Sequence, residues 1–230
     1  MGIDFILVSL SMKEDCFMSG CGCEVEIQDA SQKKVLYWLL GINAVMFAIE
    51  LGVGVLADST ALIADSLDML ADAVVYAIGI YAVGKSIIHK AKAARVSGYF
   101  QLMLGAIILI DIIRRSVKGS EPVSHLMIGM GAVALVANVI CLFIIRSHKD
   151  GEVHMRASWI FSANDVIANM GVIFAGALVL WLDSRLPDLI IGMVVSVIVL
   201  RGAWMILKDA KSELAANQTL TDNANSEGVS

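Results

Sequence analysis

The stretch from Ala61 to Gly84 constrains this chain most, because it is long and apolar enough to cross a bilayer and yet contains three acids. A membrane helix needs about 20 predominantly apolar residues. Asp65, Asp68 and Asp72 are spaced by three and four residues, so they share one stripe of a helix. An Asp at mid-membrane costs about 2.5 to 3.5 kcal/mol on insertion scales. The stripe should therefore face a protein interior and have a function, with a divalent cation as its natural partner.

The composition predicts an all-α membrane protein. Of the 230 residues 58% are hydrophobic, the mean hydropathy is +0.77, and there are only two prolines. The net charge of −5 is mild and the basic residues are scattered, so nothing indicates a nucleic-acid partner. A hydrolase that uses paired intramembrane aspartates is disfavoured, because the sequence shows no sign of a peptide groove.

Six apolar runs predict six transmembrane helices joined by short connections. They divide the chain into a polar tail (residues 1–33), a six-helix transmembrane domain (residues 34–211) and a disordered C-terminal tail (residues 212–230). The runs cover residues 35–57, 61–84, 94–113, 126–145, 158–182 and 189–207.

The distribution of Lys and Arg predicts that both termini are cytoplasmic. Six spans put both ends of the chain on one side, and that side would hold twelve basic residues against four on the other. The four are Arg114, Arg115, Lys118 and Arg185.

The N-terminal tail contains three cysteines, Cys16, Cys21 and Cys23. Thiolates suit zinc, cadmium or copper(I), so the cluster could capture metal. A passive, reduced tail is the alternative, because a short Cys cluster has no structural context here.

The fifth apolar run carries a single acid, Asp165. Asn169 follows it by four residues and shares its helix face, and Ser162 and Asn164 are close to it in sequence.

If residues 158–182 pack against residues 61–84, Asp165 can face Asp68 and Asp72. Three carboxylates in a dry place cannot all stay ionised without a cation, because like charges raise one another's pKa. Without a metal, one or two should be protonated. Exchange of a cation for protons follows from this arrangement.

With these residues the chain resembles the cation diffusion facilitators, which are six-span antiporters of divalent metals and protons. The segment ADSLDMLADA (residues 64–73) is similar to the second-span signature, with Asp68 and Asp72 at its two ligand positions. Asp165 matches one position of the fifth-span signature. The resemblance extends over residues 33–211 and includes NAVMFAIELGVGVLADS, LIDIIRRS and PDLIIGMVVSVIVLRGAWMILKDA.

The resemblance implies a metal site made of Asp68, Asp72 and Asp165, and no prosthetic group. Where the family has a His four residues before the fifth-span Asp, this chain has Phe161, which cannot ligate. A fourth ligand could come from water or from Ser162, Asn164 or Asn169. An all-oxygen site is less selective for zinc, so iron(II), manganese, cobalt or magnesium become more plausible.

Two other family features differ in this sequence. Only His148 and His154 flank the turn where the family has a His-rich loop, and the family's C-terminal metal-binding, dimer-forming domain is not found. A homodimer would then form through membrane helices, with Gly129, Gly131 and Ala132 as one packing surface.

Several other acids allow more than one interpretation. Asp65 is either a further ligand or a polar contact between helices, and Glu50 is either a proton-pathway residue or an interhelical hydrogen-bond partner. Asp111, three and four residues before Arg114 and Arg115, predicts a helix-end ion pair. Asp188, beside Pro187, is expected to be solvated.

The resulting hypothesis is a multi-pass transporter in a bacterial-type inner membrane. It would export a divalent metal, zinc before others, in exchange for protons. One alternative is a membrane protein that binds or senses metal without transporting it. The other is a carrier of the same family for iron(II), manganese, cobalt or cadmium.

Overall fold

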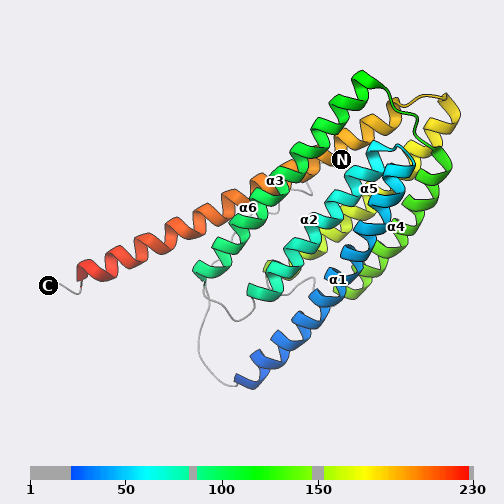
Figure 1. Cartoon of the computed structure of the whole chain (residues 1–230). Coiled ribbons are helices and arrows are strands. Elements are labelled where there is room, and N and C mark those ends of the chain that lie inside the picture. Colours follow the sequence, from blue (N-terminus) through cyan, green and yellow to red (C-terminus); the bar gives the residue numbers. More distant parts are fainter. Residues whose placement is uncertain (1–21, 83–86, 147–152, 228–230) are drawn as a thin grey trace, which may run out of the picture.

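The computed structural model describes residues 22–82, 87–146 and 153–227, which form six helices and the turns between them (Figure 1). Each helix contains most of one predicted apolar run, although the first run extends one residue past its helix, to Ala57, and residues 83–84 of the second run are outside the described residues. The helices are α1 (Gly22–Leu56), α2 (Thr60–Ala82), α3 (Ile87–Lys118), α4 (Ser124–Ile145), α5 (Val153–Leu182) and α6 (Leu186–Glu227).

The helical part of the chain is longer than predicted at both ends. α1 begins at Gly22, inside the predicted tail of residues 1–33. α6 continues to Glu227, although residues 212–230 were expected to be disordered. Residues 203–227 contain no Gly or Pro and include good helix formers such as Leu, Ala, Glu and Gln, so nothing in the sequence stops α6 when its apolar part ends.

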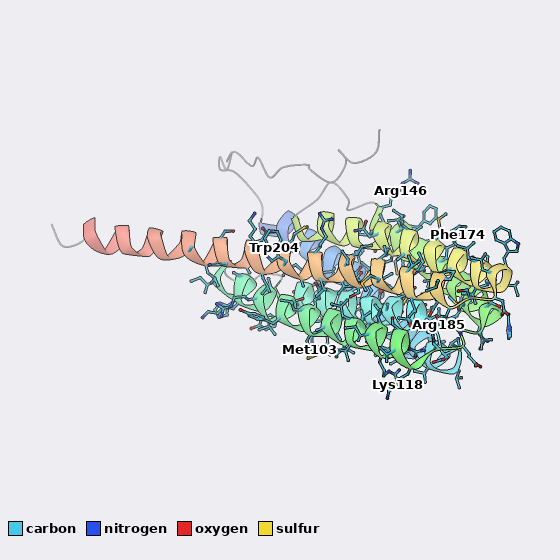
Figure 2. The ribbon with its side chains drawn as sticks, turned by 90° about the horizontal axis from the view of Figure 1, so that it is seen from above. Met103, Lys118, Arg146, Phe174, Arg185 and Trp204 are labelled. Carbon is cyan, nitrogen blue, oxygen red and sulfur yellow. The ribbon has the colours of Figure 1, made fainter. Side chains whose placement is uncertain are left out.

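Five of the six helices are long and apolar enough to cross a membrane. α2 is not among them, because its 23 residues contain the three acids Asp65, Asp68 and Asp72. Large apolar side chains are exposed on the outside of the bundle, for example Met103 of α3, Phe174 of α5 and Trp204 of α6 (Figure 2). Such a surface is expected of helices that face lipid.

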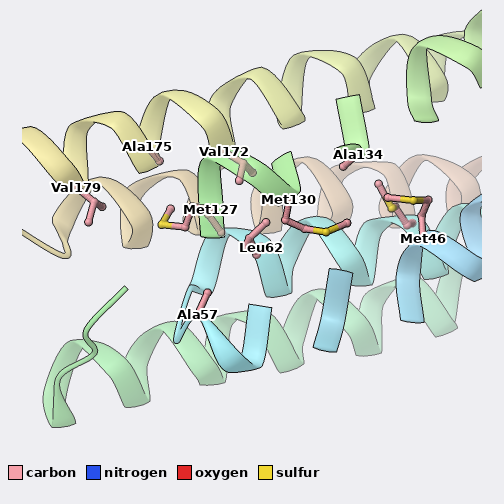
Figure 3. Close-up of a cluster of buried hydrophobic side chains, with 11 residues drawn as sticks. Met46, Ala57, Leu62, Met127, Met130, Ala134, Val172, Ala175 and Val179 are labelled. Carbon is pink, nitrogen blue, oxygen red and sulfur yellow. The ribbon is translucent and has the colours of Figure 1, made fainter. Parts of the chain in front are cut away.

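α2 is the central helix of the bundle, because it contacts each of the other five helices. It contributes to two apolar cores. One core joins α2 to α1, α4 and α5 through residues such as Leu62, Met127 and Val172 (Figure 3). The other joins α2 to α3 and α6 through residues such as Leu67 and Val199.

Three turns meet at one end of the bundle, which we call the turn end: residues 57–59, 119–123 and 183–185. The backbone N–H of Val123 donates a 2.8 Å hydrogen bond to the carbonyl of Ala57. Arg115 of α3 is ion-paired with Asp58 and also donates a 2.7 Å hydrogen bond to the backbone carbonyl of Asp58. The chain reverses direction in each turn, so α1 starts and α6 finishes away from the turn end.

The predicted ion pair between Asp111 and the two arginines is confirmed. Arg114 and Arg115 bind the two carboxylate oxygens of Asp111 at 2.6 Å and 2.7 Å. The side chain of Arg115 is only 6% exposed. It therefore joins α3 to the turn between α1 and α2, which the sequence did not predict.

Asp188 at the start of α6 was expected to be solvated, and this prediction is wrong. Its side chain is fully buried. One carboxylate oxygen accepts hydrogen bonds from the Ser59 hydroxyl at 2.6 Å and the Ala61 N–H at 3.0 Å, and the other accepts from the Thr60 N–H at 2.7 Å. Asp188 thus satisfies free backbone donors in the first turn of α2 and fixes that helix against α6.

One residue of the predicted dimer surface lies inside the bundle. A Cβ on Gly131 would be 3.0 Å from Ile173 of α5, so this glycine allows α4 and α5 to approach closely. Gly129 and Ala132 are exposed. Gly131 is therefore not available to a second copy of the chain, because it lies on the opposite face of α4 from its two neighbours.

Candidate metal site

The acid stripe of α2 lies in the interior of the bundle, between the two apolar cores. Asp65 is 1% exposed and Asp72 is 4% exposed, whereas Asp68 is half-buried. Apolar α2 residues pack on either side of the stripe, Leu62 and Met69 in one core and others in the second core. Burial of both faces of α2 is what directs the stripe toward protein and away from lipid.

The carboxyl groups of Asp72 on α2 and Asp165 on α5 lie within hydrogen-bonding reach of each other. We call them the α2–α5 pair. Asp165 is 6% exposed, and its Oδ2 has no hydrogen-bond partner. Tyr76, one turn beyond Asp72, donates a 3.0 Å hydrogen bond from its hydroxyl to Asp72 Oδ2 and lies 3.3 Å from the Ser162 hydroxyl. The pair thus has one free carboxylate oxygen and two hydroxyl groups beside it.

Asp68 lies close enough to the α2–α5 pair to interact electrostatically with both of its members. Across residues 22–82, 87–146 and 153–227, however, no three His, Cys, Asp or Glu side chains have the arrangement of a metal-binding group. Asp72 and Asp165 thus lie close to each other, and Asp68 lies near them, but the three carboxyl groups do not form a complete metal site.

Asp65 has polar partners of its own. Its Oδ2 accepts a 2.7 Å hydrogen bond from the Asn169 amide, and the Asn169 oxygen accepts a 3.2 Å bond from the Asn138 amide of α4. Its carboxyl group is also close enough to Glu50 on α1 to interact with it electrostatically. Asn169, one of the candidate fourth ligands, is thus engaged by Asp65.

No positive side chain balances this group of acids. In the described part of the chain, none of Asp65, Asp68, Asp72 and Asp165 is ion-paired with a Lys, Arg or His. Carboxylates in a low-dielectric interior need either a cation or protons, because both desolvation and mutual repulsion oppose their charged forms. The arrangement can therefore bind a cation and release protons when it does so.

The remaining predicted residues lie elsewhere. Asn164, predicted as an alternative ligand, is exposed on the outer side of α5, because it is out of phase with the buried stripe of Ser162, Asp165 and Asn169. Three predicted residues are outside the described parts of the chain, and of three others only the backbone is described. The first three are Cys16, Cys21 and His148, and the others are Cys23, His154 and Phe161.

The sequence prediction missed Tyr76 as a partner of the site. Its spacing was visible, because it follows Asp72 by four residues and so continues the acid stripe by one turn. In the sequence, a Tyr among apolar residues could equally be a core residue that only fills space. The position of the Ser162 hydroxyl opposite that of Tyr76 indicates a role at the site.

We expect Tyr76→Phe to weaken metal binding by about 10-fold, because substitution of a residue that orients a metal ligand typically costs 10- to 100-fold. The change removes the hydroxyl that donates to Asp72 and keeps the ring in the core. Zinc titration of the purified protein measures the effect. Tyr81→Phe, on the same helix and exposed, is the matched control. Equal affinities for Tyr76→Phe and the parent would remove Tyr76 from the site.

The chain is similar in sequence to one known family of domains and to several curated proteins. The cation efflux transmembrane domain family matches residues 36–215. The zinc transporter ZitB of Escherichia coli is 26% identical over 200 residues, and a cadmium, cobalt and zinc/H(+)-K(+) antiporter of Bacillus subtilis is 22% identical over 197. These alignments cover 81% and 80% of this chain but only 64% and 63% of the two relatives. The vacuolar zinc transporter ZRC1 of Saccharomyces cerevisiae is 28% identical over 133 residues, which is 52% of this chain and 30% of that protein.

Proposed function

Because this chain belongs to the cation efflux transmembrane domain family, we propose that it exports a divalent metal ion across a membrane in exchange for protons. The α2–α5 pair supports this proposal most strongly, because it brings two buried acids from distant parts of the chain together without a positive partner. Asp68 would complete the site when an ion binds. The Ser162 hydroxyl or water would be the fourth ligand.

We propose zinc as the first cargo. The names of the bacterial relatives mention zinc, and that of the Bacillus subtilis relative also mentions cadmium and cobalt. The site in this chain consists of oxygen atoms, which discriminate less strongly between divalent metals than imidazole does. A broader metal range than that of a histidine-containing site follows.

We further propose that α2 also crosses the bilayer, which gives the domain of residues 34–211 six spans in total. Both termini would then lie in the cytoplasm of a bacterial-type cell. α2 lies within the bundle in contact with all five apolar helices, which would shield its acids from lipid. The turn end would then face outward. A homodimer would use exposed positions of α4 such as Gly129 and Ala132.

Proton exchange would follow from the charge of the site. When metal binds, the acids release protons, and when protons return from outside, the metal leaves. Alternating access would require the helices around the site to tilt, so that the site opens to one side at a time.

The proposal is tested by zinc flux into proteoliposomes with a pH gradient across the bilayer. We expect zinc to accumulate on the acidic side and accumulation to stop when a protonophore removes the gradient. Zinc movement that ignores the gradient would contradict proton exchange. Zinc binding without any movement would instead favour the metal-sensing alternative.

We expect Phe161→His to shift metal preference toward zinc. The residue is four positions before Asp165 on α5, so an imidazole there shares the helix face of that acid. Nitrogen ligands suit zinc better than manganese. The ratio of zinc to manganese uptake, measured in competition, should rise about 10-fold, or about 1.4 kcal/mol of relative binding.

Phe161→Leu controls for loss of the aromatic ring alone. If the ratio is the same in Phe161→His and Phe161→Leu, residue 161 does not reach the metal.

A further inference from the structure

A second pair of buried acids faces each other about 10 Å along α2 from Asp72, at 1.5 Å per residue. It consists of Glu50 of α1 and Asp65 of α2, whose carboxyl groups are close enough to interact electrostatically. We call it the α1–α2 pair. Glu50 is fully buried, and Asp65 is 1% exposed. Since α2 begins at Thr60, this pair is nearer the turn end than the α2–α5 pair is.

The carboxylate of Glu50 receives no hydrogen bond, since neither of its oxygens has a donor as a partner. Asp65 receives one donor, the Asn169 amide, which is itself held by Asn138. Four helices therefore converge on the pair, each with one polar side chain: α1, α2, α4 and α5. A buried carboxylate without donors is costly, and its partner here is another acid.

We propose that the α1–α2 pair is a second cation-binding subsite, separate from the α2–α5 pair and placed between it and the turn end. The two pairs share the same features: two buried carboxyl groups from different helices, an unpartnered oxygen and, among the described residues, no ion-paired base. A divalent cation bound through one or two carboxylates and water is an ordinary coordination for hard metals. The inference rests on the proposed transport function, since it extends the ion path.

Two subsites in series would serve transport because an ion must be bound well enough to enter and weakly enough to leave. The α1–α2 pair receives a hydrogen bond from the Asn169 amide, whereas the α2–α5 pair receives one from the Tyr76 hydroxyl, so the surroundings of the two pairs differ. An ion that leaves Asp72 and Asp165 for the turn end would meet Glu50 and Asp65 next.

The test counts zinc ions bound to the full chain in nanodiscs after equilibrium dialysis against zinc chloride. All samples carry Cys16→Ser, Cys21→Ser and Cys23→Ser, so that thiolates add nothing to the count. We expect two ions in this parent and one in the parent with Glu50→Gln, which removes one charge but keeps the size of the side chain. Asp72→Asn with Asp165→Asn should also leave one ion, and all three changes together none.

Asp209→Asn is the matched control, because Asp209 is an exposed acid of α6 and its loss should leave two ions. If Glu50→Gln prevents folding, Asp65→Asn tests the same subsite and should also leave one ion. If neither Glu50→Gln nor Asp65→Asn lowers the number of bound zinc ions, the inference is overturned. This includes the case in which Glu50→Gln changes only the pH dependence of zinc flux, since the pair would then hold a proton.

The proposed function fails by a different result. If Asp72→Asn with Asp165→Asn leaves the count and the zinc flux unchanged, the α2–α5 pair is not the metal site, whatever Glu50→Gln does.

Discussion

Replacing both members of the α2–α5 pair, by Asp72→Asn and Asp165→Asn together, is expected to reduce zinc transport by at least about 100-fold. Loss of an orienting residue alone costs up to about 100-fold in metal affinity, and this change removes two ligands. Asparagine keeps the size of each side chain and removes its charge, so the two apolar cores around α2 should be unaffected. Zinc uptake into inverted membrane vesicles measures the result.

Asp183→Asn together with Asp209→Asn is the matched control, because these two acids are exposed and lie away from the stripe. It should transport zinc at the parent rate. Parent-like transport by the Asp72 and Asp165 variant would mean that the site lies elsewhere in the chain. Each single variant should lose most of the activity, since one remaining carboxylate cannot hold the ion from two helices.

Asp188→Asn is expected to lower the free energy of unfolding by about 1 to 3 kcal/mol, the usual cost of leaving a buried hydrogen-bonding group unsatisfied. Both oxygens of Asp188 accept hydrogen bonds, one from Ser59 and Ala61 and the other from Thr60. An amide must point its NH₂ group at one of these sets of donors. The first turn of α2 would therefore lose at least one of its acceptors.

Thermal unfolding in detergent measures this effect, with Asp183→Asn as the comparison. Asp183 lies in the turn just before α6, close to Asp188 in sequence, but it is exposed. A drop in unfolding temperature for Asp188→Asn alone is expected. Equal drops for both variants would show that the turn, and not the buried carboxylate, determines stability.

The helices and the acid stripe could be predicted from the sequence, because both depend on local spacing. Long apolar runs predict helices in a membrane, and intervals of three and four residues put Asp65, Asp68 and Asp72 on one face. The meeting of Asp72 with Asp165 was also predicted, although only as a consequence of an assumed contact between two helices.

What could not be predicted depends on how each helix is rotated against its neighbours. Asn164 and Asn169 look equally suitable in the sequence, but only Asn169 faces the interior. Gly131 and Gly129 differ in the same way. Asp188 was misjudged because a Pro and a turn beside it are typical of solvent exposure, whereas its burial results from contact with Ser59, 129 residues earlier in the chain.

The polar contacts of the turn end give the bundle a preferred direction of opening. Through charge-assisted hydrogen bonds, Asp188, Arg115 and Asp58 connect the turn at residues 57–59 to the start of α6, to α3 and to the turn at residues 119–123. These bonds hold the helices together at the turn end, so the helices can separate more readily at the opposite end of the bundle. In the proposed transport cycle, an ion that leaves through the turn end would require these hydrogen bonds to break and form again, and the side chains of Asp188 and Arg115 that make them are buried.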